Sequence, residues 1–156
     1  MEAGGNNPMA NNNLDFRAYF TITSQLPLKD ITKHIGVDPD DRSWSNGDLR
    51  LPSQHSIYAF SRWSLSSGIQ IGAPLDEHLK SLWSRMAPFR KQICNRPADM
   101  NAHIACTGTF QTKSETILLS AGHFSTAAYY KIVIDFDFYF EDSFDNDEVG
   151  KPYWKW

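Results

Sequence analysis

The element that decides the fold lies at residues 14–23, which read LDFRAYFTIT. Apolar side chains occupy every even position from Leu14 to Ile22, and polar or amphipathic ones occupy the odd positions between them. Alternation with a period of two is typical of a strand that is covered on one face only. The sequence therefore predicts a sheet with one apolar face against a core and one open polar face.

Four further segments have strand character, because apolar and polar residues alternate in them or because they are short and apolar. The segment at 57–66 carries aromatic residues on both faces, which predicts a central position in the sheet. Together with 14–23, these segments predict a sheet of about five strands. The four segments are 57–66, 102–111, 117–122 and 136–141.

Two main helices are expected from apolar residues at helical spacing. The shorter spans 24–36 and ends at Gly36, since glycine tolerates the left-handed conformation that follows many helices. The longer begins at Pro74, and its apolar face continues to Ile93 with an interruption at Pro88.

The segment at 124–134 admits two interpretations. Ser125 could cap a helix that runs through Lys131, whereas the apolar even positions also extend the last strand backwards. We favour a short helix or turn before the strand. The order of elements predicts an α+β domain, in which a largely antiparallel sheet of about five strands carries the two main helices on one face.

Composition divides the 156 residues into three parts. The Asn- and Gly-rich residues 1–13 predict a disordered arm, and 14–142 predict a single domain. Residues 143–156 form an acidic and aromatic tail. No apolar run reaches the roughly 20 residues of a membrane helix, and a formal net charge of −3 argues against nucleic-acid binding.

Cysteine usage and the N-terminus bear on the compartment. Cys94 and Cys106 form no metal-binding or disulfide-rich pattern, which favours a reducing environment. The first residues lack the basic start and apolar core of a secretory signal. We therefore expect a cytoplasmic protein without a membrane partner.

Several short motifs are similar to those of a known family. They are LPLKDIT at 26–32, IGVDP at 35–39, Ser43-Trp44, Gly47-Asp48, WSLS at 63–66 and LDEHL at 75–79. On these motifs the chain resembles the domain of unknown function 4279 family from Phe16 to Glu141. The resemblance implies a small bacterial α+β domain and supplies no reaction. Some small proteins of this kind resemble immunity proteins, which neutralise a toxin.

The spacing of reactive residues gives no support to catalysis or metal binding. Cys106 and His103 lie three apart on an expected strand, so their side chains point to opposite faces. The five histidines show no metal-ligand spacing. Asp135 and Asp137 share a strand face about 6–7 Å apart, which fits a solvated face better than a hydrolytic pair. We expect no catalytic residue, no metal and no cofactor.

Acidic residues are concentrated near the end of the chain. From 132 to 150 there are seven acids and no Lys or Arg, whereas the rest of the chain carries 15 bases and 11 acids. Acids beside aromatic residues suit an interface with a basic protein surface. We therefore expect a non-catalytic protein-binding module, and the resemblance extends this to an immunity protein that binds a cognate protein toxin. The residues expected at the interface are Tyr19, Asp135, Asp137, Tyr139, Glu141 and Asp142.

Two alternatives stay open from the sequence. Trp44, in a loop beside Arg42, could line a pocket for a small ligand, which would make the protein a sensor or an enzyme. The open sheet face or the aromatic tail could instead form a homodimer. The oligomeric state, monomer or homodimer, is not decided by the residues.

Overall fold

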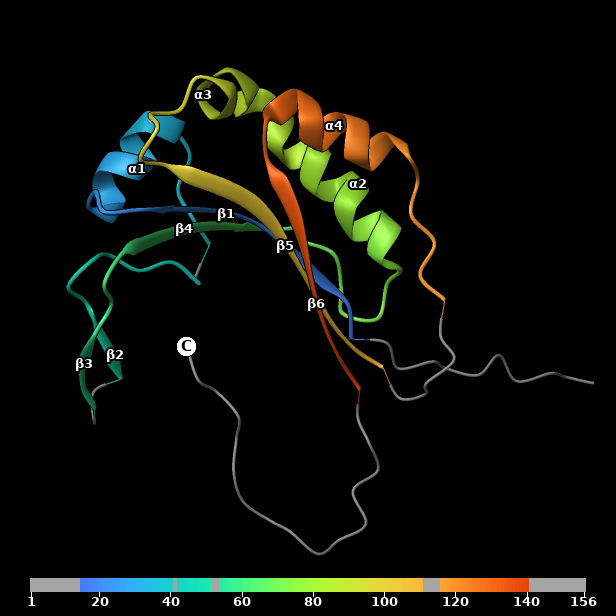
Figure 1. Ribbon diagram of the computed structural model, residues 1–156, viewed down its shortest axis with the longest axis horizontal. Coiled ribbons are helices and arrows are strands. Elements are labelled where there is room, and N and C mark those ends of the chain that lie inside the picture. The colour runs from blue at the N-terminus through green and yellow to red at the C-terminus, as the bar shows by residue number, and fades with distance from the viewer. Residues whose placement is uncertain (1–14, 41, 52–53, 111–115, 141–156) are drawn as a thin grey trace, which may run out of the picture.

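The computed structural model describes residues 15–40, 42–51, 54–110 and 116–140. The strands are β1 (Arg17–Ser24), β2 (Leu49–Leu51), β3 (Gln54–Ile57), β4 (Ser61–Ser66), β5 (Asn101–Phe110) and β6 (Val133–Phe140). The helices are α1 (Leu28–Ile35), α2 (Leu75–Met86), the short 3₁₀ helix η1 (Ala87–Phe89), α3 (Arg90–Cys94) and α4 (Gly122–Tyr130). The helices α1 to α4 lie on one side of the main sheet, so the molecule has two layers (Figure 1).

The prediction of an α+β domain with α1 and α2 on one face is confirmed, but the sheet differs from the one expected. The main sheet has four strands in the order β4–β1–β5–β6, and β2 with β3 forms a separate two-stranded sheet. Strand β1 is antiparallel to both neighbours, whereas β5 and β6 run parallel. A parallel pair needs a crossover connection, and α4 lies on the crossover here.

Two strand predictions were wrong. The segment at 57–66 is divided between β3 and β4, because the backbone of Tyr58 pairs with Gly47 and Asp48 before the chain bends. The expected strand at 117–122 is absent from the described residues 116–120, which have no regular structure. There the N–H of Ser120 donates to the carboxylate of Asp76 over 2.9 Å.

Strand β4 lies at the edge of the main sheet, contrary to the prediction of a central strand. A loop bonds to its outer side, since the backbones of Trp44 and Arg62 exchange hydrogen bonds of 3.0 and 2.8 Å. The N–H of Asp40 donates to the carbonyl of Ser64 over 2.8 Å, and Ser43 Oγ accepts from the N–H of Ser64 over 2.9 Å. The loop therefore protects an edge that could otherwise pair with another chain.

The helical interpretation of the segment at 124–134 is confirmed by α4, although Ser125 does not cap it. The helix begins at Gly122, and Lys131 ends it with a left-handed backbone at φ 54°. This turn allows the chain to reverse onto β6, which begins at Val133.

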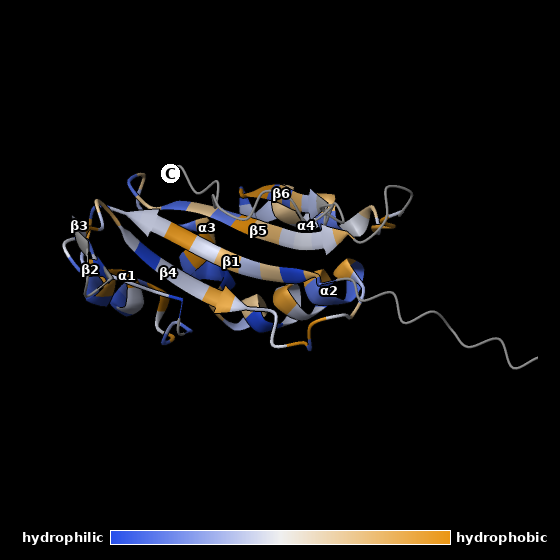
Figure 2. Cartoon of the chain, turned by 90° about the horizontal axis from the view of Figure 1, so that it is seen from below, coloured by the Kyte–Doolittle hydropathy of each residue, from blue (hydrophilic) through white to orange (hydrophobic). Residues whose placement is uncertain are grey.

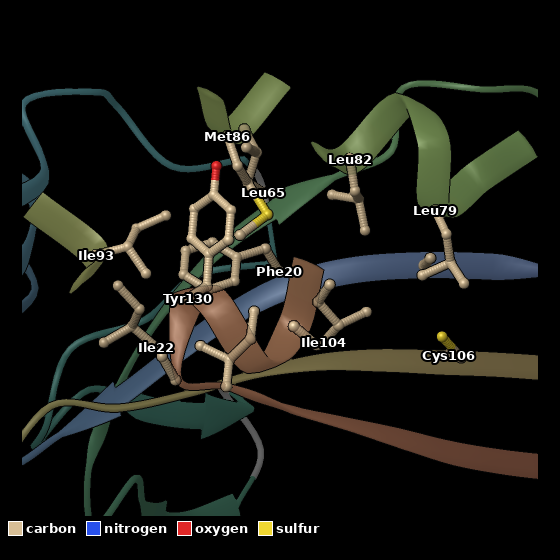
Figure 3. Packing of buried hydrophobic residues seen from close by; sticks show 14 of the residues in the cluster. Phe20, Ile22, Leu65, Leu79, Leu82, Met86, Ile93, Ile104, Cys106 and Tyr130 are labelled. Atoms are coloured by element: carbon tan, nitrogen blue, oxygen red, sulfur yellow. The ribbon is translucent and has the colours of Figure 1, made fainter. Parts of the chain in front are cut away.

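The core lies between the sheet and the helices (Figure 3). The even-numbered side chains of β1 point into it, as the alternating pattern predicts. Each large apolar side chain that becomes fully buried contributes about 1.5–3 kcal/mol. The fully buried members include Phe20, Ile22, Ile31, Trp63, Leu79, Leu82, Met86, Ile93 and Ile104.

A polar network inside the helical layer fastens α4 to α2. The indole N–H of Trp83 donates to Nδ1 of His123 over 2.9 Å, so the imidazole proton lies on Nε2, which is 2.7 Å from Asp76 Oδ1. Hydrogen bonds from Lys80, then from Ser120 and His123, hold the pKa of Asp76 well below its ordinary value. The network accounts for the burial of His123, because both ring nitrogens have a hydrogen-bond partner.

Two predicted segments, the arm at 1–13 and the tail at 143–156, lie outside the described residues. Among the helices of the described ranges, none combines the length and the apolar character that crossing a membrane requires.

Phenylalanine rings pack closely near the C-terminal ends of β5 and β6. Phe16, Phe110 and Phe138 make edge-to-face contacts with ring centroids 5.3–6.0 Å apart. A methyl group at Gly108 would lie 2.5 Å from Cδ1 of Phe16 and 3.3 Å from Cδ1 of Phe138. Glycine at this position therefore makes room for the aromatic cluster.

We expect Gly108→Ala to lower the free energy of unfolding by about 1–3 kcal/mol, because overpacking displaces the rings. Urea denaturation followed by circular dichroism measures this change. Thr109→Ser, which alters the open side of the same strand, is the control and should change stability by less than about 0.5 kcal/mol. Equal stability of Gly108→Ala and wild type would show that the rings move freely.

Candidate functional site

The face of the main sheet opposite the helices is a candidate interaction surface (Figure 2). The strand register places Tyr19 beside Ala105, and Ala105 beside Asp135. The same register places Thr107 beside Asp137. We call the face of the main sheet that lies opposite the helices the open face. The predicted residues Tyr19, Asp135, Asp137 and Tyr139 therefore share it, whereas Glu141 and Asp142 lie outside the described residues.

Strand β6 forms the acidic side of the open face. The side chain of Asp135 is 61% exposed, and Asp137 is exposed as well. Asp137 Oδ2 accepts a hydrogen bond of 2.7 Å from the hydroxyl of Tyr139, which raises the pKa of that hydroxyl. Val133, with 62% exposure, adds an apolar residue to this strand.

His103 lies between the acidic and basic sides of the open face. Its Nε2 is 4.0 Å from Asp135 Oδ2. Burial lowers the pKa of His103, Asp135 opposes that shift, and Arg62 adds to it. The imidazole therefore favours its neutral form, in which it does not compensate the charge of Asp135.

The β4 side of the open face is basic and is covered by the chain itself. Thr21 and Ser64 belong to this face, yet both are buried. The guanidinium of Arg62 donates to their hydroxyl groups over 3.5 and 3.1 Å. Arg42 lies over the ring of Tyr19, 5.0 Å from its centroid. The open face is thus exposed at β6, whereas at β4 the side chain of Arg62 covers it, contrary to the expectation of a fully open face.

A pocket of about 550 Å³ opens beside Trp44, where the sequence suggested a small-ligand site. The rings of Trp44 and Tyr58 stack with centroids 4.2 Å apart, and Trp44 Nε1 donates to the carbonyl of Phe60 over 3.1 Å. The guanidiniums of Arg62 and Arg50 lie over Trp44 and Tyr58, respectively, at 5.1 and 5.3 Å from the ring centroids. The lining residues are Arg42, Ser43, Trp44, Asp48, Leu49, Arg50, Tyr58 and Arg62.

The family model described as "Domain of unknown function (DUF4279)" matches residues 14–141. The chain belongs to this family. No curated protein and no solved structure matches it.

In this DUF4279 chain the cysteine and the histidine that the sequence offered as a nucleophile and its base are separated by the sheet. Cys106 lies in the core and His103 on the open face, as their spacing predicted. Burial raises the pKa of the Cys106 thiol to about 12, so the thiolate is strongly disfavoured at neutral pH. Within the described ranges, His, Cys, Asp and Glu side chains form no group of three that could hold a metal ion.

Sequence reasoning missed one buried polar pair in this DUF4279 chain. Ser67 Oγ and His78 Nδ1 lie 2.6 Å apart, and Nε2 of His78 is buried without a hydrogen-bond partner in the described part of the chain. The carbonyl of Ser67 also accepts from the hydroxyl of Ser81 over 2.6 Å. The pair therefore ties the loop after β4 to α2. The sequence indicated an exposed position for His78 at the front of its helix. This was wrong, because helical spacing places His78 with Leu75 and Leu82 on the buried side.

Burial lowers the pKa of His78 below its ordinary value of 6.5. The unfolded chain therefore binds a proton more readily than the folded chain, and the stability contributed by neutral His78 is lost as pH falls below about 6.5. We expect His78→Asn to make the decrease in unfolding free energy between pH 7 and pH 5 shallower than in wild type. Urea denaturation across this range measures the slope.

Ser67→Ala is the matched control for this prediction, because it removes the hydroxyl partner and leaves the buried imidazole in place. It should lower stability at every pH and retain a dependence on pH. A wild-type slope in His78→Asn would contradict the assignment of this acid sensitivity to His78.

Proposed function

We propose that this DUF4279 protein is a non-catalytic protein-binding module that meets its partner through the open face. The observation that supports this proposal best is an exposed strip on β6. Its side chains, at alternate positions, point away from the core, and they are Val133, Asp135, Asp137 and Tyr139. Polar, charged and aromatic groups on a rigid strand are suited to recognising another protein. The helices α1 to α4 cover the other face of the sheet, and the packed core lies between them and the strands.

The partner surface that fits this strip is basic. Among the described residues, the possible cation that lies near Asp135 is His103, and the burial of that imidazole favours its neutral form. The two aspartates can therefore attract positive charge from a partner and accelerate the first encounter. The aromatic ring of Tyr139, 45% exposed as a residue, adds contact area beside them.

Within this class we propose a bacterial immunity protein that acts in the cytoplasm and neutralises a cognate toxin by forming a stoichiometric complex. A toxin that acts on nucleic acid or nucleotides carries basic surface, which complements the acids of β6. Binding in a 1:1 complex requires the open face to be free in the unbound protein. A homodimer formed through this face would be the competing arrangement.

The test of this proposal compares two variants of equal charge change. Asp135→Lys/Asp137→Lys reverses the acidic strip, and Asp30→Lys/Glu77→Lys makes the same change on exposed helical positions of the opposite layer. Tagged full-length proteins are used to capture partners from the native cells. We expect wild type and the helical variant to retain the same protein, and the strip variant to lose it.

Binding kinetics with the purified partner then give the decisive measurement. We expect the strip variant to associate at least about tenfold more slowly at low salt, with a smaller difference at high salt, because the attraction is screened. If the partner is a toxin, coexpression of wild type should rescue growth and coexpression of the strip variant should not. Normal binding by the strip variant, or a wild-type dimer that hides the face, would refute the proposal.

A further inference from the structure

Three arginines line the pocket beside Trp44, and two of them, Arg42 and Arg62, are close enough to repel each other. Arg42, Arg50 and Arg62 all line it, and none forms an ion pair with another described residue. Asp48 is the one acid in the lining, and its Oδ2 accepts from the N–H of Ser45 over 2.6 Å. The lining thus carries three positive charges and one negative charge, a net charge of about +2 at neutral pH.

The repulsion among these positive charges is electrostatically unfavourable. Burial lowers the pKa of Arg62, and the neighbouring charge of Arg42 lowers it further. A guanidinium stays protonated under these conditions, so the repulsion persists and an anion would relieve it. Two of the five N–H groups of Arg62 donate to Thr21 and Ser64, and the other three make no hydrogen bond with the described residues.

The walls of the pocket are fixed before any ligand arrives. The backbones of Trp44 and Arg62 are paired in both directions, and the N–H of Gly47 donates to the carbonyl of Tyr58 over 2.9 Å. Arg50 and Arg62 each lie on an aromatic ring, which restrains the position of their guanidiniums. Binding therefore requires less ordering of long side chains than arginines usually need.

The chemistry of the walls selects an oxyanion rather than a stacking ligand. Trp44 and Tyr58 already stack on each other, and arginines cover them further, so their rings offer little room for a planar ligand. Guanidinium groups match phosphate oxygens with paired hydrogen bonds. A volume of about 550 Å³ lies within the range of small-molecule sites.

We propose that this pocket binds a small phosphorylated molecule through a phosphate group of about two negative charges, held by Arg42 and Arg62. This site is separate from the acidic strip of β6 and does not depend on the protein-binding proposal. The pocket approaches the open face through Arg62, which spans both. Inorganic pyrophosphate is the probe that tests the phosphate contacts without any organic group.

Isothermal titration of the full-length protein with pyrophosphate, in a buffer of low ionic strength, measures the site. We expect one molecule to bind each chain, and Arg42→Gln to weaken binding by about tenfold because one charge-assisted contact is lost. Arg90→Gln is the matched control, since Arg90 lies on α3 over Tyr129 and away from the pocket. It should bind pyrophosphate with an affinity within twofold of wild type.

A second variant and a second measurement keep the test decisive. Arg62→Gln should also weaken binding, but it removes hydrogen bonds to buried Thr21 and Ser64, so its folding is checked by circular dichroism. Thermal unfolding is followed with pyrophosphate, sulfate, malonate and sodium chloride at matched ionic strength. We expect pyrophosphate to raise Tm most in wild type and in Arg90→Gln, and to lose most of that effect in Arg42→Gln.

Three results would overturn the proposal. They are an absence of pyrophosphate binding at millimolar concentration, equal binding by Arg42→Gln and wild type, and an equal rise in Tm with sodium chloride. The last result would mean that salt merely screens the repulsion among the arginines. Malonate binding as tight as pyrophosphate would assign the pocket to carboxylates and would equally reject the phosphate ligand.

Discussion

Burial of the even-numbered side chains of β1 is the constraint on which the rest of the structure depends. Phe20 and Ile22 are fully buried, and a slip of one residue would move them to the opposite side of the sheet. Their positions fix the outward direction of Tyr19. Pairing with β4 and β5 then carries the same division of faces to the neighbouring strands. The polar surface is thus a direct consequence of how the core is filled.

Local patterns were enough to predict much of this arrangement from the sequence. The alternation in β1 and β5, the glycine after α1 and the proline before α2 each depend on nearby residues, and the structure confirms them. The sequence also predicted that Tyr19, Asp135 and Tyr139 share a face, because alternate residues of a strand point to the same side of the sheet. The placement of these residues was therefore predictable, whereas their use is a proposal.

The features that escaped sequence reasoning depend on residues far apart in the chain. The parallel pairing of β5 and β6 follows from α4, whose segment was also compatible with a strand. The sequence suggested a pocket beside Trp44 but not its basic lining, because Arg42 and Arg62 come together only when a loop bonds to the edge of β4. Ser67 and His78 form no recognisable motif, since their closeness arises from the way a loop returns to α2. The spacing of residues along the sequence contains little information about such long-range contacts.

The order of strands in the sheet has a consequence for synthesis on the ribosome. Strand β1 can pair with β4 early, but its other neighbour, β5, emerges only after α2 and α3 have been made. Until then the nascent chain exposes an unpaired row of backbone groups beside apolar Phe20 and Ile22, a combination that favours aggregation. Slow elongation between β4 and β5 would therefore prolong the most vulnerable stage in the life of this protein.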